Sequence, residues 1–369
     1  MPASPDNTTD LIHFTAQTDQ GFFIPTLVMA TSARANMAPG SCYHFHLFHA
    51  PLEEWQITAA RQLETDSFKI SLYEVKEGRH TSFKQKNHVT PISLVRLELP
   101  ERLPDLDKIL YLDGDILVQQ DLTELYQTEL GDHLIAAVAD MMAGIFNPYT
   151  NELPGDAYVN SGVMLMNLRQ MRQEGTVDKF FQTKATTPPH WIFQDQDVVN
   201  ACCANRILRL HPRYNGLVTT FERVPDLTVE QYNQFYHTNY TSRQDVEQDY
   251  AIVHLAGTPG RRPWERADGV YCTQWQHYFM LSPVRRVNLH LQTPWEYCLP
   301  KPVQKYQYGL GRFLPVFTVR VSYRANKCSL RKQLKLFGFI PLLCAEGSPS
   351  KLTWKLFNLL PVWQTSEKE

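Results

Sequence analysis

Several common signatures are missing from this 369-residue chain, and each absence excludes a class of protein. The seven cysteines form no Cys-x-x-Cys pair, which favours a reducing compartment and excludes a disulfide framework and a thiolate zinc site. No run of 18 apolar residues is present, so no ordinary transmembrane helix is expected. The opening residues, MPASPDNTTDLIHF, have neither the basic nor the apolar segment of a secretory signal. We therefore expect a cytosolic globular protein.

Two nucleotide-binding motifs are also missing. No Gly-x-Gly-x-x-Gly follows the first apolar run, and no P-loop is present, which argues against a dinucleotide-binding or P-loop protein. Strand-like and helix-like stretches nevertheless alternate through the first 280 residues. The patterns predict strands over 11–15, 43–48, 68–75 and 108–112, and helices over 23–35 and 52–64. This alternation predicts an α/β fold with a mostly parallel, Rossmann-like sheet flanked by helices.

The charge divides the chain into two parts. Residues 281–369 contain 14 Lys or Arg and 4 Asp or Glu, a net charge of +10, whereas residues 1–280 have a net charge of −12. The basic part also repeats itself, because Lys335-Leu-Phe-Gly-Phe-Ile-Pro recurs as Lys355-Leu-Phe-Asn-Leu-Leu-Pro. We expect a catalytic domain over 1–280 and a basic helical extension over 281–369. The extension would either attach to an anionic membrane surface or pack on the main domain.

The strongest local signal is the acidic turn within Lys108-Ile-Leu-Tyr-Leu-Asp-Gly-Asp-Ile-Leu-Val. Asp113 and Asp115 flank Gly114 where one apolar run ends and another begins. Two carboxylates this close are costly to bury unless a cation compensates them, and a hard divalent metal would do so. The alternative is a solvated turn, since Asp-Gly is common in turns.

Polar motifs recur at intervals before and after this turn. They are Arg96 in Leu94-Val-Arg-Leu, Tyr158-Val-Asn-Ser-Gly-Val, Gln194-Asp-Gln-Asp-Val-Val-Asn and His254-Leu-Ala-Gly followed by Arg262-Pro-Trp. In this order, with this spacing, the motifs resemble glycosyltransferase family 8, which includes bacterial lipopolysaccharide glucosyl- and galactosyltransferases. The resemblance spans about residues 11–280.

The resemblance implies a GT-A fold, a UDP-sugar donor, a Mn²⁺ or Mg²⁺ cofactor, and transfer with retention of the anomeric configuration. It implies that Asp113, Asp115 and His254 bind the metal, with Gly114 and Gly257 completing their motifs in the donor site. Arg262 matches the family's phosphate-binding basic residue, although it follows His254 by eight positions and not by the usual six.

The same resemblance assigns the sugar side of the site. Asp195 would hydrogen-bond donor-sugar hydroxyls, Asn160 would contact the sugar or the acceptor, and Arg96 would contact the donor. Gln196 takes the place where a double displacement needs a nucleophile. Because an amide is a poor nucleophile, we expect front-face attack with Gln196 stabilising positive charge on the sugar.

The uracil-binding loop matches less closely. Asp19 and Phe22 align with a family pattern that holds the base, but Gly21 replaces its Asn and Phe22 has no phenolic hydroxyl. Phe22 can still stack on the uracil ring.

One group of histidines stays outside these motifs. His44, His46 and His49 have spacings that suggest a metal cluster, and the polar face of a strand explains them more simply.

Together these features predict a hexosyltransferase that uses UDP-glucose or UDP-galactose and a glycan or glycolipid acceptor, with lipopolysaccharide or lipooligosaccharide core as the leading acceptor. Its expected location is the cytoplasmic face of the inner membrane, and no nucleic-acid partner is expected. A protein or soluble carbohydrate acceptor, or a catalytically silent nucleotide-sugar-binding protein, remains the alternative.

Overall fold

The computed structural model divides the chain into two compact units, one of residues 1–256 with 278–290 and one of residues 257–277 with 291–369. The described residues are 11–76, 78–83, 90–143, 158–188, 191, 193, 195–224, 226–256, 262–264 and 271–287, together with six strands between residues 303 and 366.

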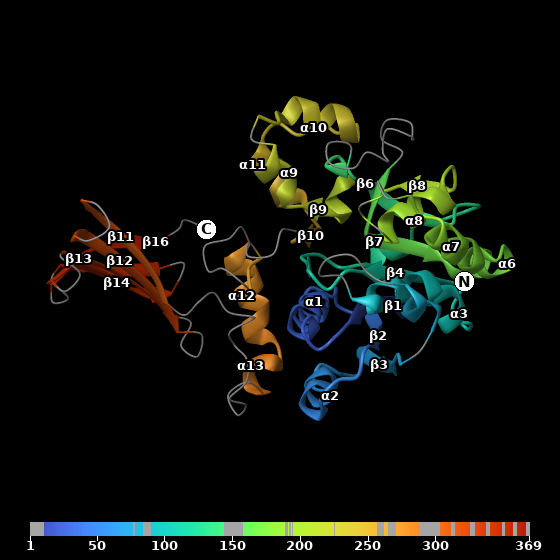
Figure 1. Cartoon of the computed structure of the whole chain (residues 1–369), viewed down its shortest axis with the longest axis horizontal. Helices are drawn as coiled ribbons and strands as arrows, with labels where there is room; N and C mark the ends of the chain where they lie inside the picture. Colours follow the sequence, from blue (N-terminus) through green and yellow to red (C-terminus); the bar gives the residue numbers. More distant parts are fainter. Residues whose placement is uncertain are drawn as a thin grey trace, which may run out of the picture. The chain divides into compact units, whose positions relative to one another are not determined.

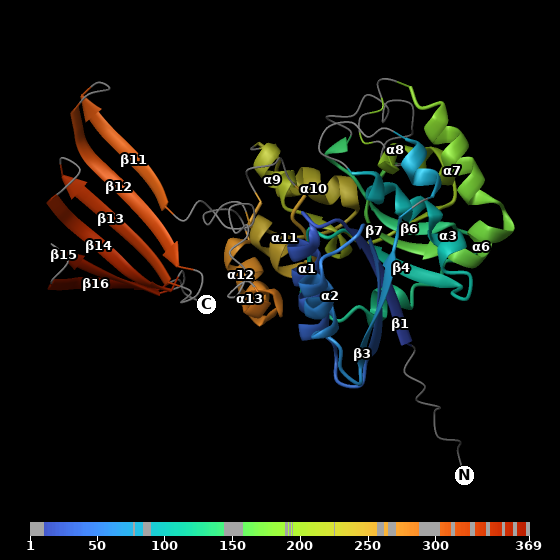
Figure 2. The ribbon, with the colours of Figure 1, turned by 60° about the horizontal axis from the view of Figure 1, so that its bottom comes forward.

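The first unit contains a seven-stranded sheet with the strand order β3-β2-β1-β4-β7-β6-β8 (Figures 1 and 2). The strands are β1 (Leu11–Thr18), β2 (Cys42–His49), β3 (Phe68–Glu74), β4 (Lys108–Leu112), β6 (Ile135–Ala139), β7 (Val159–Asn167) and β8 (Ile207–Arg209). All neighbouring pairs are parallel except those of β7, which runs antiparallel to both β4 and β6. The expectation of an α/β fold with a mostly parallel sheet is therefore confirmed.

Helices cover both faces of this sheet. Figure 2 shows α1 and α2 on one face and α3, α6, α7 and α8 on the other. The helical segments of this part are α1 (Phe23–Ala35), α2 (Glu54–Arg61), η1 (Arg79–Ser82), η2 (Pro91–Glu98), α3 (Leu99–Arg102), α4 (Thr123–Tyr126), α6 (Leu168–Gln173), α7 (Thr176–Ala185) and α8 (Asp195–Cys203). The expected helix over 23–35 matches α1, the expected helix over 52–64 is shorter, and the expected strands all form.

Side-chain alternation along the strands explains why both faces are covered. On β2, Tyr43 and Phe45 are fully buried on one face, and Phe45 stacks on Phe14 of β1 at 4.6 Å between ring centroids. The other face of β2 carries His44, His46 and Phe48, and Phe48 joins the core cluster formed with η2, α6, α7 and α8. The period-2 pattern read from the sequence thus separates two cores.

A second, three-stranded sheet lies beside the acidic turn. It has the order β5-β10-β9, with β5 (Ile116–Val118), β9 (Gly216–Leu217) and β10 (Ile252–His254). The remaining helices are η5 (Pro212–Tyr214), α9 (Thr219–Arg223), α10 (Val229–Tyr236), α11 (Arg243–Asp249), α12 (Cys272–Leu281) and α13 (Val284–Val287). Among the described residues, none of the helices has the length and apolar character that a bilayer crossing requires.

The second unit contains a six-stranded antiparallel sheet whose strands follow one another in chain order. These strands are β11 (Val303–Leu310), β12 (Leu314–Arg324), β13 (Ser329–Leu336), β14 (Ile340–Ser348), β15 (Lys351–Leu356) and β16 (Leu360–Ser366). The expectation of a helical extension is wrong, because the residues described between 303 and 366 are strands.

The physical reason lies in the prolines. Pro341 pairs with Lys335 and Pro361 pairs with Lys355, and in each hairpin the register shifts at that pair. Proline cannot donate to a strand ladder, so a bulge next to a turn is a position where a sheet tolerates it. A proline that would break a helix is therefore compatible with these strands.

The hairpins also extend the repeat seen in the sequence. Leu310 pairs with Leu314, Leu336 with Ile340, and Leu356 with Leu360, each next to a proline and a shifted register. The sequence repeat thus corresponds to a hairpin that occurs a third time, at β11 and β12.

Whether a domain boundary falls at residue 280 stays a prediction.

Candidate active site

The acidic turn is held between two sheets. Asp113 follows β4, and its backbone N–H donates to the carbonyl of Gly162 on β7 at 2.8 Å. Asp115 precedes β5, and its carbonyl accepts from the N–H of Leu255 at 2.8 Å. The two carboxylates therefore lie where the carboxyl end of β4 meets the small sheet, the edge at which open α/β sheets bind ligands.

His254, the last residue of β10, lies next to these carboxylates. Its Nε2 is 3.3 Å from Asp115 Oδ1 and 3.8 Å from Asp113 Oδ2. One ligand atom from each of the three residues lies within 4.8 Å of the other two. Antiparallel pairing of His254 with Ile116, directly after Asp115, creates this arrangement. Residues 140 positions apart in the chain are thus brought together as the sequence motifs imply.

The donor set fits a hard or borderline divalent cation. Two carboxylate oxygens and one imidazole nitrogen suit Mn²⁺ and Mg²⁺ and leave coordination positions for a substrate's oxygens. The other ring nitrogen of His254, Nδ1, lies 2.9 Å from Asn215 Oδ1, so an Nδ1–H donor leaves Nε2 facing the carboxylates. Asn215 thus orients the imidazole, a role that no motif in the sequence signals.

The charges around His254 favour a cation. Burial by itself lowers the pKa of the His254 imidazole, but Asp115 and then Asp113 raise that pKa above its ordinary value overall. The stabilisation of a proton at this position shows that the pocket has excess negative potential. A divalent ion would experience the same potential.

Gly162 is required by the closeness of the groups around it. A Cβ atom at this position would lie 2.2 Å from His254 Cε1 and 2.9 Å from Asp113 Oδ2. Any side chain here would displace the imidazole or the carboxylate, so the glycine of the Asn-Ser-Gly motif makes room for the cluster.

Arg96 connects the cluster of Asp113, Asp115 and His254 to Asp195. Its Nη2 donates to Asp113 Oδ1 at 2.8 Å, and its Nε lies 3.1 Å from Asp195 Oδ2. Its guanidinium carbon stacks 4.5 Å over the Tyr111 ring, whose hydroxyl also donates to Asp113. Arg96 is 7% exposed, so it acts mainly through these residues and orients two carboxylates at once.

Burial raises the pKa of the Asp195 carboxyl, while Arg96 opposes that rise. The ion pair with Arg96 therefore helps to keep a desolvated carboxylate charged. A charged Asp195 can only accept hydrogen bonds, so any group that binds it has to be a donor.

Gln196 is held at both ends of its amide. Its Oε1 accepts from the backbone N–H of Ser161 at 3.0 Å, and its Nε2 donates to Asp140 Oδ2 at 3.1 Å. Asn160 donates to the same Asp140 oxygen at 3.0 Å and accepts from Asn215 at 3.0 Å. One buried network thus links Gln196, Asn160 and Asn215 to His254.

The sequence reading missed Asp140 at the centre of this network. Asp140 follows β6 directly and is 7% exposed. A signal was available, because an acid at the end of a buried strand is the same feature that identified Asp113.

The loop expected to bind the base lies at the acidic turn. Asp19 Oδ1 accepts from the N–H of Phe22 at 2.8 Å, which shapes the entry to α1. A Cβ atom on Gly114 would lie 3.0 Å from the Phe22 ring and 2.4 Å from Thr26 Oγ1. Phe22 is therefore next to the turn between the two carboxylates, and Gly114 allows that approach.

Two predicted residues do not belong to the described part of the first unit. Gly257 lies outside the described residues. Arg262 belongs to the second unit, where its guanidinium lies 5.6 Å from the centroid of the Trp264 ring.

Comparisons with known proteins identify the family of this chain. The family profile "Glycosyl transferase family 8" matches residues 13–268. A lipopolysaccharide 1,2-glucosyltransferase of Escherichia coli is 26% identical over 275 residues, which is 72% of this chain and 74% of that protein. General stress protein A of Bacillus subtilis is 24% identical over 231 residues, 59% of this chain and 76% of that protein.

Among solved structures, the galactosyltransferase LgtC in complex with donor and acceptor sugar analogues matches with a TM-score of 0.63 and 24% identity. The match covers 73% of this chain and 96% of LgtC. At this identity the likeness establishes the fold, which is the GT-A glycosyltransferase fold.

The chain belongs to glycosyltransferase family 8, since the family profile covers more than half of it. It is a glycosyltransferase, and the family resemblance read from its motifs is confirmed.

Proposed function

We propose that this chain is a metal-dependent, retaining hexosyltransferase that moves glucose or galactose from a UDP-sugar to the lipopolysaccharide or lipooligosaccharide core. The observation that carries this proposal is the cluster of Asp113, Asp115 and His254 with Arg96 joining it to Asp195. The named activities of the glucosyltransferase relative and of LgtC support the choice of hexose and acceptor.

The roles of the residues follow from their contacts. Asp113, Asp115 and His254 would hold Mn²⁺ or Mg²⁺, which, when bound, offsets negative charge on the leaving diphosphate. Asn215 keeps His254 Nε2 directed at the carboxylates. Phe22, which lies beside Gly114, would stack on the uracil ring next to the diphosphate. Arg262 remains our candidate for a phosphate contact.

The contacts of Gln196 favour front-face attack. Its amide oxygen, the atom that would have to attack the sugar, already accepts from Ser161 N–H. A fixed amide dipole can stabilise positive charge on the sugar ring in the transition state. Asp195 would bind the sugar hydroxyls, and Arg96 would keep that carboxylate charged and oriented.

The sheet of the second unit supports a location at a membrane surface. Strand register places Lys305, Arg320, Arg324, Arg331, Lys335, Lys351 and Lys355 at positions of one face, which we call the basic face. Glu346 is the acid on that face within the described strands. Each basic residue near an anionic bilayer contributes about 1 kcal/mol. We propose that this face binds the cytoplasmic surface of the inner membrane, where a glycolipid acceptor is available.

The decisive experiment is a screen of UDP-sugars for hydrolysis with and without Mn²⁺, which needs no acceptor. We expect release of UDP from UDP-glucose or UDP-galactose that depends on Mn²⁺. Release from neither sugar, or equal release in the presence of a chelator, would show that the proposed donor or metal is wrong.

A further inference from the structure

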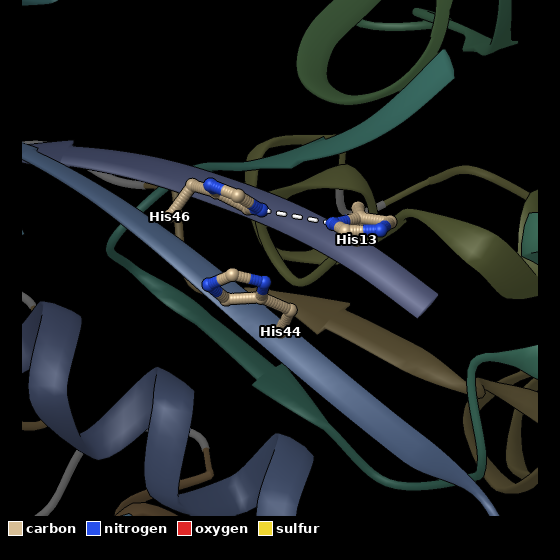
Figure 3. Close-up of side chains that lie close together, drawn as sticks. All are labelled: His13, His44 and His46. Atoms are coloured by element: carbon tan, nitrogen blue, oxygen red, sulfur yellow. Dashed lines mark hydrogen bonds between the residues drawn. The ribbon is translucent and has the colours of Figure 1, made fainter. Parts of the chain in front are cut away.

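Three histidines lie together on the first two strands, before the strand ends that face the active site. His13 of β1 pairs in register with His44 of β2, and His46 follows two residues later on the same face (Figure 3). Thr18, where β1 ends beside the active site, is five residues beyond His13. His46 pairs with Thr15, three residues before that end. At about 3.3 Å per residue, His13 therefore lies roughly 17 Å and His46 roughly 10 Å from that edge.

The three rings converge. His13 Nδ1 lies 2.9 Å from His46 Nε2, the contact drawn in Figure 3, and the rings of His44 and His46 stack with centroids 4.1 Å apart. One ring nitrogen from each histidine lies within 4.8 Å of the others. Two imidazole ligands of a tetrahedral Zn²⁺ lie about 3.3 Å apart, given Zn–N bonds of about 2.0–2.1 Å. Side-chain rotations that move the ring nitrogens by roughly 1 Å would therefore bring all three within bonding distance of one ion.

Neighbouring hydroxyls orient two of the rings. His46 Nδ1 lies 3.1 Å from the Tyr73 hydroxyl, and His44 Nε2 lies 2.8 Å from Ser71 Oγ, both on β3. Metal-binding histidines usually use their second ring nitrogen in this way, because it fixes the tautomer and the ring plane. The ring nitrogen of His46 that remains is the one that faces His13.

The imidazoles are also in the state that binds metals. Burial, and then the charge of His44, lowers the pKa of His13 to about 4. Burial, and then His44 and His13, lowers the pKa of His46 to about 3. Both rings are neutral near pH 7, so neither has to lose a positive charge. The proton between His13 Nδ1 and His46 Nε2 has only to move to another ring nitrogen for both lone pairs to face a cation. His13 and His44 are only half-buried, which leaves a path for an ion and a water ligand.

We propose that His13, His44 and His46 form a second metal site, which takes a borderline transition cation such as Zn²⁺ with water as its fourth ligand. Three nitrogen donors favour Zn²⁺, Ni²⁺ or Cu²⁺, whereas the oxygen-rich cluster at Asp113 suits Mn²⁺ and Mg²⁺. An ion here joins β1 to β2 far from the transferred sugar, so it stabilises the sheet and takes no part in transfer.

The test counts Zn²⁺ ions bound per chain by titration calorimetry of the full-length protein. The active-site cluster can also take Zn²⁺, so the measurement uses the Asp115→Ala variant as its background. We expect one bound Zn²⁺ per chain in that background and none after adding His13→Gln and His44→Gln. His211→Gln, which changes a half-exposed histidine elsewhere, is the matched control and should leave the single site intact.

Two results would overturn the proposal. One is an unchanged Zn²⁺ count after His13→Gln and His44→Gln. The other is a loss of the ion with His211→Gln as well, which would indicate non-specific binding. His13→Gln with His44→Gln in the otherwise wild-type chain should keep full Mn²⁺-dependent transfer, so this test is independent of the proposed glycosyltransferase function.

X-ray absorption at the zinc edge keeps the test decisive if the double variant folds poorly. In the Asp115→Ala background, the bound Zn²⁺ should show three imidazole ligands and one oxygen. Fewer than three imidazole ligands would exclude this site.

Discussion

The sheet of the first unit and the sheet of the second place their distinctive residues differently. In the seven-stranded sheet, two acids of the candidate site directly follow the ends of strands, Asp113 after β4 and Asp140 after β6. In the six-stranded sheet, charge and apolar character alternate along the strands, and the turns repeat one hairpin. Residues that follow strand ends gather at one edge of a sheet, whereas residues that alternate along the strands spread over one whole face of it. We therefore expect changes at strand ends to abolish transfer and changes on the basic face to affect location alone.

The largest expected effect is that of Asp115→Ala. The variant loses a metal ligand, and with it several kcal/mol of transition-state stabilisation, so transfer should fall by roughly 10³-fold or more. The protein should stay folded at pH 8, because removing one of two adjacent carboxylates also removes their repulsion. The melting temperature should no longer rise on addition of Mn²⁺ with UDP.

Asp121→Ala is the matched control for that variant. Asp121 accepts from Ala38 N–H, Thr123 N–H and the Tyr43 hydroxyl, so its loss should lower the melting temperature and leave the response to Mn²⁺ intact. Near-normal donor turnover by Asp115→Ala would show that the metal is held elsewhere.

A smaller effect is expected for Gln196→Ala. Losing one fixed dipole should lower kcat by roughly 10 to 10³-fold and leave the anomer of the product unchanged, as nuclear magnetic resonance of the product would show. Gln170→Ala, which removes a glutamine that donates to Glu174 at the surface of α6, should leave kcat unchanged. A covalent sugar on Gln196, or complete loss of activity, would contradict front-face attack.

Asn215→Ala should act on the metal alone. Without its hydrogen bond, His254 loses its orientation, and the apparent affinity for Mn²⁺ should fall by roughly 10 to 100-fold. Saturating Mn²⁺ should restore kcat, which separates a positioning role from a direct role in transfer. If kcat stays low at saturating Mn²⁺, Asn215 contributes through Asn160 and the sugar side of the network instead.

The two sheets also differ in how much of them the sequence predicted. In the first unit, strand positions and the acidic turn follow from buried runs and abrupt polar ends, and β1 to β4 form where expected. Asp140 itself carries that signal, but its contact with Gln196 and the contact of Asn215 with His254 could not be read from the sequence, because they join residues 56 and 39 positions apart. Such contacts depend on the strand order, which no local pattern encodes.

In the second unit, the sequence pattern was visible but misassigned. A period-2 alternation from Leu330 to Leu336 is present, yet we expected a helical extension in which Pro341 and Pro361 would interrupt the helices. The register shows them at bulges next to turns, where a missing N–H costs little.

The histidine cluster also depends on the pairing of strands. The sequence pattern puts His44 and His46 on one face of a strand, and this is confirmed. His13 joins them only because β1 pairs with β2, which the sequence pattern does not show.

The smallest expected effect on transfer comes from the basic face. We predict that Arg320→Gln, Lys335→Gln and Lys355→Gln, made together, leave Mn²⁺-dependent hydrolysis of the donor within about twofold of wild type. Binding to anionic vesicles should weaken strongly, since each lost charge removes about 1 kcal/mol of attraction. Binding of the wild-type chain should itself weaken as salt rises, because charges are screened over about 10 Å at 0.1 M.

Lys332→Gln is the matched control, since register places it on the opposite face of the same sheet. Cosedimentation with vesicles measures both variants. If the vesicle affinity lost per removed charge is the same in the triple variant and in Lys332→Gln, then net charge, and not one face of the sheet, drives binding. An unchanged affinity in the triple variant would remove the membrane-binding role from this face.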